Sequence, residues 1–275
     1  MQVIILGSGS PLPDPLRAGP STLIRTTAGD FLFDCGRGVL MRAAAAGSGA
    51  GAFRALLLTH LHSDHITDLN DIYTMRWALS FQPNPLPVFG PGGTAALLRA
   101  TEAMLEPDIG YRLAHHEDLQ WRPSAEVTEV EAGLVFEDGA VRITAAPTDH
   151  APVRPTLGYR IDDGDDSVVI AGDTVPCAGL DELSRNADVL VQTVVRRDLI
   201  EQFGLPRLTD VLDYHSSVTD AAETATRNRV GTLLLTHLVP TPAPGTEEEW
   251  LGQARAHFDG TVVLASDLLT IEVHA

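Results

Sequence analysis

Lysine is absent from this sequence of 275 residues, and all 19 basic residues are arginines. Catalysis through a lysine amine or a lysine Schiff base is therefore excluded. Cysteine is scarce as well. Cys35 and Cys177 are the two cysteines, too few for a disulfide framework, so we expect a reducing, cytoplasmic location.

Long hydrophobic runs and familiar nucleotide motifs are also missing. No apolar run approaches the roughly 20 residues that a membrane-spanning helix needs. The first residues, MQVIILGSGSPLP, lack the charged region of a secretory signal, so no membrane association is expected. A dinucleotide fingerprint at residues 7–12 fails because Leu12 stands at the third glycine position. H-E-x-x-H, Walker A and G-x-S-x-G motifs are absent.

Positive charge is in short supply. The chain has 19 arginines against 37 acidic residues, which gives a formal net charge of −18. Bound cations can offset part of this charge, because aspartate ligands and metal ions neutralise each other. The remainder should still repel polyanions, which need clustered basic contacts. The composition therefore argues against a nucleic acid as a partner.

The sequence does contain many short apolar runs that are bounded by turn residues. Such runs predict strands, and they lie at residues 2–10, 30–36, 55–61, 86–90, 141–147, 167–173, 187–195, 231–237 and 261–266. Helices are predicted over residues 92–105 and 217–229, the second with Ser217 or Thr219 as its N-cap. Buried strands that alternate with helices indicate a layered α/β architecture. No long linker divides the chain.

The segment ALLLTHLHSDHITDL, residues 55–69, places ligand-type side chains directly after one predicted strand. It contains H-x-H-x-D-H, formed by His60, His62, Asp64 and His65. Alternation along an extended chain puts the first three on one side, and a turn near Asp64 swings His65 towards a neighbouring point. Imidazole and carboxylate without thiolate suit Zn²⁺, and also Mn²⁺ or Fe. The motif therefore predicts a metal site.

Three further strand exits carry one ligand-type residue each. They are His150 after VRITAAPTD, Asp173 after SVVIAG, and His237 after GTLLLT. In open α/β sheets, sites gather outside the carboxyl ends of the strands. We therefore expect these side chains to converge with the first motif.

These features together resemble the metallo-β-lactamase fold superfamily. The similarity is greatest to the ribonuclease Z branch, which includes arylsulfatase-like and cyclic-phosphodiesterase-like hydrolases. The stretches that carry it lie between residues 6 and 237: LGSGSPLPDPLRAGPSTLI, FLFDCGRG, LTHLHSDHITDL, PLPVFGPGG, DHAPVRPTLGYRI, AGDT, YHSS and LLLTH. The resemblance implies one domain over residues 1–275, a four-layer αββα sandwich with two metals at the sheet edges, and a homodimer.

The resemblance also implies how seven ligands divide between two divalent ions, with Zn²⁺ expected and Mn²⁺ or Fe as alternatives. His60, His62 and His150 hold one ion, Asp64, His65 and His237 hold the other, and Asp173 bridges both. Two such ions can share a hydroxide and lower its proton affinity, which makes a nucleophile at neutral pH. His62 replaces the glutamate of diiron redox members, which favours hydrolysis.

Two residues are expected to be catalytic. His215 matches the family histidine that assists proton transfer to the leaving group, and Asp64 acts beside the metals. A histidine in a capping region without chemistry is the alternative for His215. Asp34 in FLFDCG matches a position that supports the ligand loop, as a hydrogen-bond partner behind a ligating histidine.

The chain departs from ribonuclease Z in features that bear on substrate. Members that process tRNA carry a long inserted arm after the third-motif histidine, but 22 residues separate His150 from Asp173 here. The residues after His237, LVPTPAPG, lack the family's Ser/Arg-rich continuation, and the chain is acidic. We therefore expect a small-molecule ester as substrate, a phosphodiester first, and no nucleic acid.

Arginines and a tryptophan near the motifs are candidates for binding an anionic substrate: Arg76, Trp77, Arg196 and Arg197. Solvated surface arginines are the simpler reading. Other activities stay open, namely hydrolysis of a sulfate ester, a lactone or a carboxylic ester, and tRNA 3′-end cleavage of the ribonuclease Z type. A non-catalytic metal-binding protein is the remaining alternative.

Overall fold

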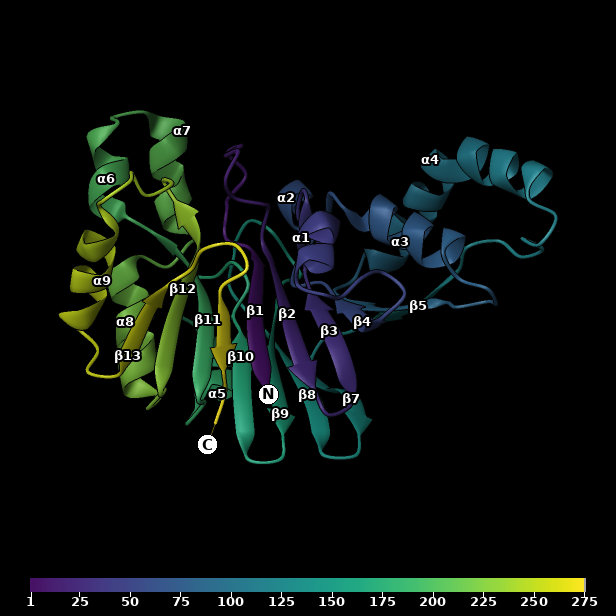
Figure 1. Ribbon diagram of the computed structural model, residues 1–275. Coiled ribbons are helices and arrows are strands. Elements are labelled where there is room, and N and C mark those ends of the chain that lie inside the picture. The colour runs from purple at the N-terminus through teal and green to yellow at the C-terminus, as the bar shows by residue number, and fades with distance from the viewer. Residues whose placement is uncertain (275) are drawn as a thin grey trace.

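The computed structural model describes residues 1–274, whose strands form two seven-stranded sheets packed face to face (Figure 1). The first sheet has the order β14-β1-β2-β3-β4-β5-β6. Its strands are β1 (Gln2–Gly7), β2 (Ser21–Thr26), β3 (Gly29–Phe33), β4 (Phe53–Leu57), β5 (Leu86–Gly90), β6 (Ala125–Glu129) and β14 (Thr270–Glu272). The second sheet has the order β13-β12-β11-β10-β9-β8-β7. Its strands are β7 (Gly133–Asp138), β8 (Val141–Pro147), β9 (Leu157–Asp163), β10 (Asp166–Ile170), β11 (Val189–Val195), β12 (Thr232–Val239) and β13 (Thr261–Leu264).

Helices cover the outer faces of both sheets. Those beside the first sheet are α1 (Val39–Ala45), α2 (Ser63–Ile66), α3 (Leu69–Ala78) and α4 (Thr94–His115). Those beside the second sheet are α5 (Ala178–Ser184), α6 (Arg197–Gln202), α7 (Pro206–Thr209), the 3₁₀ helix η1 (Asp210–Asp213), α8 (Val218–Arg227) and α9 (Glu247–Arg255). This arrangement confirms the predicted four-layer αββα sandwich.

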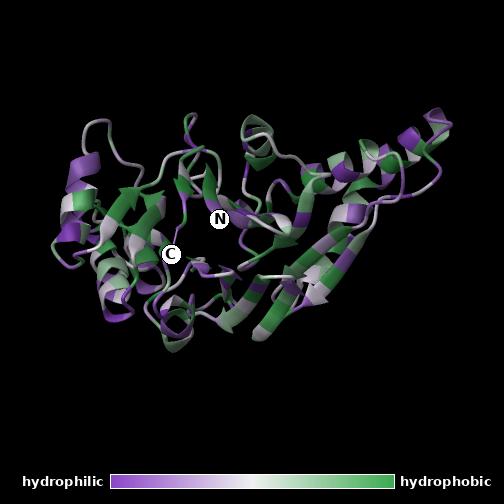
Figure 2. Ribbon diagram, turned by 60° about the horizontal axis from the view of Figure 1, so that its bottom comes forward, coloured by the Kyte–Doolittle hydropathy of each residue, from purple (hydrophilic) through white to green (hydrophobic). Residues whose placement is uncertain are grey.

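The central strands are apolar on both faces because they are covered on both sides. In β3, Phe31 and Phe33 face the second sheet, whereas Leu32 packs under the helices of its own side. Val189 and Val191 of β11 likewise enter the core between the sheets. Side chains alternate across a strand, so continuous apolar runs supply two cores at once. Figure 2 shows the apolar strands inside and more polar helix faces outside.

Helix α8 illustrates how local sequence and packing agree. Ser217 caps it by accepting a hydrogen bond from the backbone N–H of Asp220, whose side chain accepts one from the Ser217 backbone in return. This capping box satisfies backbone groups that a helix start leaves free. Val218, Ala222 and Ala225 are buried against the second sheet. Ser217 is therefore the N-cap, and the alternative Thr219 lies within the helix.

The carboxyl ends of parallel strands gather at one edge of the sandwich, the upper edge in Figure 1. In the first sheet β3 runs parallel to β4, and in the second sheet β10, β11 and β12 run parallel to one another. Residues that follow these strands therefore meet where the two sheets adjoin. Within residues 1–274, no helix is long and apolar enough to cross a membrane.

Candidate metal centre

The four members of the H-x-H-x-D-H motif emerge together at this edge. His60 follows β4, His62 is the N-cap of α2, and His65 lies in that helix. Nε2 of His60 lies 3.0 Å from Nδ1 of His62. A four-residue helix starts at Ser63 and brings His65 to a second group of donors, while its ring stays close to that of His60, with 4.1 Å between the ring centroids.

The remaining predicted ligands join the motif from the second sheet. His150 follows β8, and its Nε2 lies 3.3 Å from Nδ1 of His62. His237 lies in β12, and its Nε2 is 3.2 Å from Oδ2 of Asp64. Ligand atoms within 4.8 Å of one another form a first group of His60, His62, His150 and Asp173 and a second group of Asp64, His65 and His237. A third group, Asp173, His215 and His237, overlaps both.

Asp173 lies between the two groups. Its Oδ2 is 3.8 Å from Nε2 of His60 in the first group and 3.4 Å from Nε2 of His65 in the second. It also lies 3.2 Å from Nε2 of His215. One carboxylate oxygen thus faces imidazoles of both groups.

Several buried side-chain nitrogen and oxygen atoms of this cluster lack hydrogen-bond partners among the described residues. They are Nε2 of His65, Oδ1 of Asp173 and Nδ1 of His237. A buried polar atom without a partner is costly, so such atoms mark the place of a missing ligand. Imidazole and carboxylate donors without thiolate suit a divalent ion such as zinc. The residues present therefore fit divalent metal ions.

The electrostatics of the cluster also favour a cation. Burial lowers the pKa of His60 well below its ordinary value and lowers that of His150 to about 4. Both rings are therefore neutral at pH 7, the form that binds metal. Burial acts to raise the pKa of Asp173, but the charges of His237 and His65 hold it well below its ordinary value. His60 and His150 therefore offer lone pairs to a metal. Burial acts to lower the pKa of His65 and His237, but the Asp173 carboxylate raises both above the ordinary value, so these two rings must lose a proton when they bind a metal.

A layer of hydrogen bonds behind the cluster fixes the rings. The Asp34 carboxylate contacts Nδ1 of His65 at 2.8 Å and accepts from Thr59 Oγ1 at 2.8 Å. Thr59 Oγ1 in turn lies 3.0 Å from Nδ1 of His60. Sequence reasoning missed Thr59, although a threonine precedes the histidine in both LTH segments. These contacts leave the Nε2 atoms of both histidines facing the centre.

Backbone carbonyls in and directly after η1 hold the rings of His150 and His215. Nδ1 of His150 lies 2.8 Å from the Tyr214 carbonyl oxygen, and Nδ1 of His215 lies 3.0 Å from that of Val211. Because a carbonyl only accepts, each Nδ1 carries the proton and donates it. Nε2 of each ring is then directed to the cluster.

Two residues of the site have strained backbones. Asp34 has a φ of 57° and His237 a φ of 48°, both in the left-handed region that non-glycine residues rarely adopt. Strain of this kind concentrates at functional sites, where surrounding contacts enforce it. At Asp34 the enforcing contacts are its hydrogen bonds to Thr59 and His65.

Arg76 and Trp77 do not reach the centre. The Arg76 guanidinium is buried and donates to the backbone carbonyls of Ala50, Phe53, Asn84 and Pro85. Trp77 donates its indole N–H to the Trp121 carbonyl. Their donors are engaged within the protein, and neither residue lines the cavity beside the cluster, so nothing in the structure supports a contact with substrate. Arg76 instead anchors the turn after α3.

Arg196 and Arg197 do not line the cavity beside the cluster either. Arg196 is buried, pairs with Asp198 at 2.7 Å and lies over the Trp250 ring. These contacts hold most of the guanidinium in local structure, and nothing in the structure supports a contact with substrate. Arg197 is exposed and lies 4.0 Å from Glu201, which agrees with the simpler reading of a solvated surface arginine.

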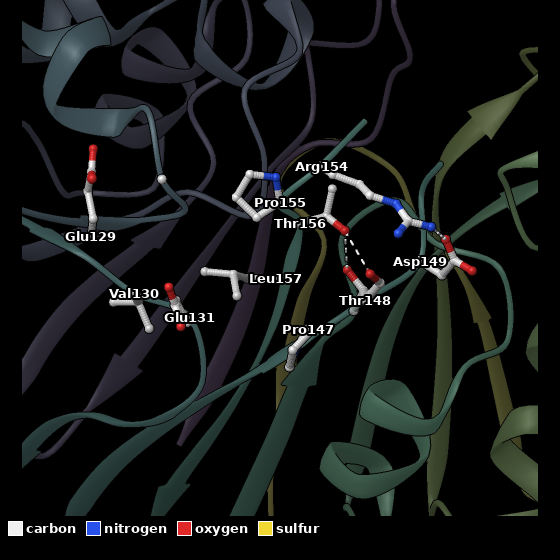
Figure 3. A pocket seen from close by; sticks show the side chains of 11 residues that line it. Glu129, Val130, Glu131, Pro147, Thr148, Asp149, Arg154, Pro155, Thr156 and Leu157 are labelled. Atoms are coloured by element: carbon white, nitrogen blue, oxygen red, sulfur yellow. Dashed lines mark hydrogen bonds and ion pairs between the residues drawn. The ribbon is translucent and has the colours of Figure 1, made fainter. Parts of the chain in front are cut away.

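Two cavities adjoin the site. One of about 200 Å³ touches His62, Asp64, Asp173, His215 and His237 directly. The other, of about 560 Å³, lies beside the loop that carries His150 and is lined by Glu129, Glu131 and Asp149 (Figure 3). Arg154 is paired with Asp149 there. The smaller cavity is the one that touches the candidate metal ligands directly, so it is the better place for a reacting ester.

The family follows from a comparison with known proteins. Residues 30–238 match the family model described as the beta-lactamase superfamily domain.

The chain belongs to the metallo-β-lactamase superfamily.

Its curated relatives place it in the ribonuclease Z branch of that superfamily. A protein named Ribonuclease Z from Mycolicibacterium gilvum is 54% identical over 276 residues, covering all of this chain and 96% of that protein. A protein of the same name from Mycobacterium bovis is 52% identical, covering all of this chain and 99% of that protein. The crystal structure of human tRNase Z, short form, has a TM-score of 0.73 at 22% identity over the whole of both chains, which supports the fold.

These relatives correct the predicted partner. A small-molecule ester as substrate, with nucleic acid excluded, is contradicted by relatives named Ribonuclease Z. Those proteins match this chain over 96% and 99% of their own lengths, so a long inserted arm has no room in them either. Its absence therefore does not argue against the ribonuclease Z branch. The predicted superfamily and a metallo-hydrolase are confirmed.

Proposed function

We propose that this protein is a ribonuclease Z-type endonuclease, which hydrolyses a phosphodiester bond at the 3′ end of precursor tRNA. The observation that carries this proposal is the end-to-end match to proteins named Ribonuclease Z at 52–54% identity. Similarity at that level extends over the strands, the helices and the loops that surround the metal cluster. The convergence of seven ligand-type residues at one sheet edge supports hydrolysis as the reaction.

The metal ions are assigned to the two groups of donors, with Zn²⁺ as the proposed ion. His60, His62 and His150 would hold one, Asp64, His65 and His237 would hold the second, and Asp173 would bridge them. When bound, two such ions supply activation of water and stabilisation of the charge that develops on the phosphate. The net charge of −18 makes this neutralisation important, because no arginine lines the small cavity within the described residues.

His215 is the proposed general acid. Its Nδ1–H is held by the Val211 carbonyl, and its Nε2 faces the cluster at the Asp173 carboxylate. In the protonated ring, Nε2 can give its proton to the leaving oxygen as the P–O bond breaks, while water adds to phosphorus. Asp64 keeps His237 oriented through their 3.2 Å contact and supplies a second carboxylate beside that of Asp173.

The decisive experiment incubates purified, metal-loaded protein with a precursor tRNA that carries a 3′ extension, and maps the product end. We expect cleavage at one position and none in mature tRNA. His60→Ala should abolish cleavage. Asp30→Asn, which removes a carboxylate on β3 away from the cluster, should not. Bis(p-nitrophenyl) phosphate, a sulfate ester and a lactone serve as comparison substrates. Failure to cleave the precursor at enzyme excess would overturn the proposal.

A further inference from the structure

The small cavity beside the metal cluster is lined mainly by two kinds of residue. Some belong to the metal cluster. Others, which we call the apolar wall, are Pro11, Leu12, Leu208, Val211, Tyr214 and Val239. Apolar side chains have no role in activating water or in binding a phosphate. The apolar wall therefore requires a separate explanation.

Two segments distant in sequence build this apolar wall. Leu12 belongs to the loop between β1 and β2, and Leu208 belongs to α7. In Figure 1 this loop and α7 stand above the same edge of the sandwich. Leu12 is 55% exposed although it lines the cavity, so its apolar surface is available to a ligand. Apolar side chains exposed beside a reactive centre mark a place where a partner binds.

A buried hydroxyl at this cavity also lacks a partner. Ser10 is 2% exposed and lines the cavity, and its Oγ has no hydrogen-bond partner within residues 1–274. Leaving a buried hydroxyl unsatisfied costs free energy, which a polar atom of a bound ligand would recover. The ligand that fits this space is therefore largely apolar on its faces and carries at least one polar edge.

The charge of the cavity indicates which part of an RNA binds beside the apolar wall. The cavity is lined by carboxylates of the metal cluster and, within the described residues, by no arginine. A phosphate would be held there by the metal ions and repelled elsewhere in the cavity. A nucleobase is uncharged, has apolar faces and carries polar edges, so it can bury a face against apolar side chains while an edge meets a polar group.

We propose that Leu12, Leu208, Val211 and Val239 form a subsite for one unpaired nucleobase next to the cleaved phosphodiester, with the Ser10 hydroxyl as a polar contact. This inference rests on the proposed function and adds the part of the substrate that the apolar wall recognises. All four bases have apolar faces, so contact with a face tolerates different bases. The enzyme thus selects an unstacked nucleotide rather than a particular sequence at this position.

The test uses precursor RNAs in which the base of either nucleotide flanking the cleaved bond is removed to leave an abasic site. For wild-type protein, loss of the recognised base should lower kcat/KM roughly 10-fold, because the substrate loses the apolar surface that the base buries against the wall. Leu208→Ala and Leu12→Ala should cleave the intact RNA more slowly and lose most of the difference between intact and abasic RNA. Leu205→Ala, three residues earlier and outside the cavity lining, should keep the wild-type ratio.

The outcomes separate the two proposals. Equal cleavage of intact and abasic RNAs by the wild-type protein would overturn the subsite alone. The same would follow if Leu208→Ala and Leu12→Ala kept the wild-type ratio. No cleavage of intact precursor by metal-loaded protein would overturn the proposed function and the subsite with it. Metal content of each variant, measured alongside, shows that the metal cluster is intact.

Discussion

The Asp34 carboxylate lies 2.8 Å from Nδ1 of His65, on the side of the ring away from the metal cluster. Through Thr59 it also reaches His60, so one buried aspartate supports a histidine of each ligand group. An acceptor of this kind fixes the tautomer and the orientation of an imidazole and raises its basicity. The metal affinity of both groups should therefore depend on Asp34.

Replacement of Asp34 tests that dependence. Asp34→Asn keeps a side chain that tolerates the left-handed backbone but removes the charge. We expect metal affinity to fall about 10- to 100-fold, measured by competition with a chelator. Asp30→Asn is the matched control, because Asp30 lies on β3, the strand that Asp34 directly follows, and accepts from Ser48. Equal affinities for the two variants would contradict the supporting role.

Replacement of His215 separates acid catalysis from metal binding. His215→Ala should lower kcat for RNA cleavage by about 10²- to 10⁴-fold, because a positioned proton donor contributes that much. Metal content should stay at the wild-type level. His237→Ala should instead lose metal. A loss of metal in His215→Ala would make His215 a ligand, since it also lies within reach of Asp173 and His237.

Removal of the metal ions should destabilise the fold. The cluster joins residues after β4 to residues of the second sheet, and several of its donors have no protein partner. An ion bound to the folded state stabilises it by about 2.7 kcal/mol when its concentration is 100 times Kd. A chelator should therefore lower Tm, and added Zn²⁺ should restore it. In Asp173→Asn, the difference in Tm between metal-loaded and chelator-treated protein should be smaller. A wild-type Tm that does not change on chelation would contradict the assignment of the metal site.

Arg76 should matter for stability and not for substrate binding. Arg76→Leu leaves the carbonyls of Ala50 and Phe53 buried without their donor, which should cost on the order of 3 kcal/mol in urea unfolding. KM for RNA should stay unchanged. Arg197→Ala, at an exposed arginine, should stay within about 0.5 kcal/mol of wild type. A raised KM in Arg76→Leu at full stability would return Arg76 to the list of substrate residues.

Strongly patterned segments were predictable from the sequence. The strands β5 and β8 begin and end at the predicted residues, and Ser217 caps α8 as one of two candidates. The strands β2, β6, β7, β9 and β14 were missed. The reason is visible in β6, whose sequence AEVTE is mostly solvent-facing and carries no apolar run. Such a strand is stabilised by pairing with β5, which a local pattern cannot reveal.

The sequence by itself determined the chemistry: histidines and aspartates at strand exits, no lysine, and an order of motifs that identifies the superfamily. Donor type and spacing are local properties, so they can be recognised without a fold. Tertiary structure decided which side chains meet. It placed Asp173 between two ligand groups, took Arg76 away from the site, and brought Leu12 and Leu208 to one cavity wall. Those outcomes depend on how two sheets pack and where loops of distant sequence stand, and no local pattern specifies that.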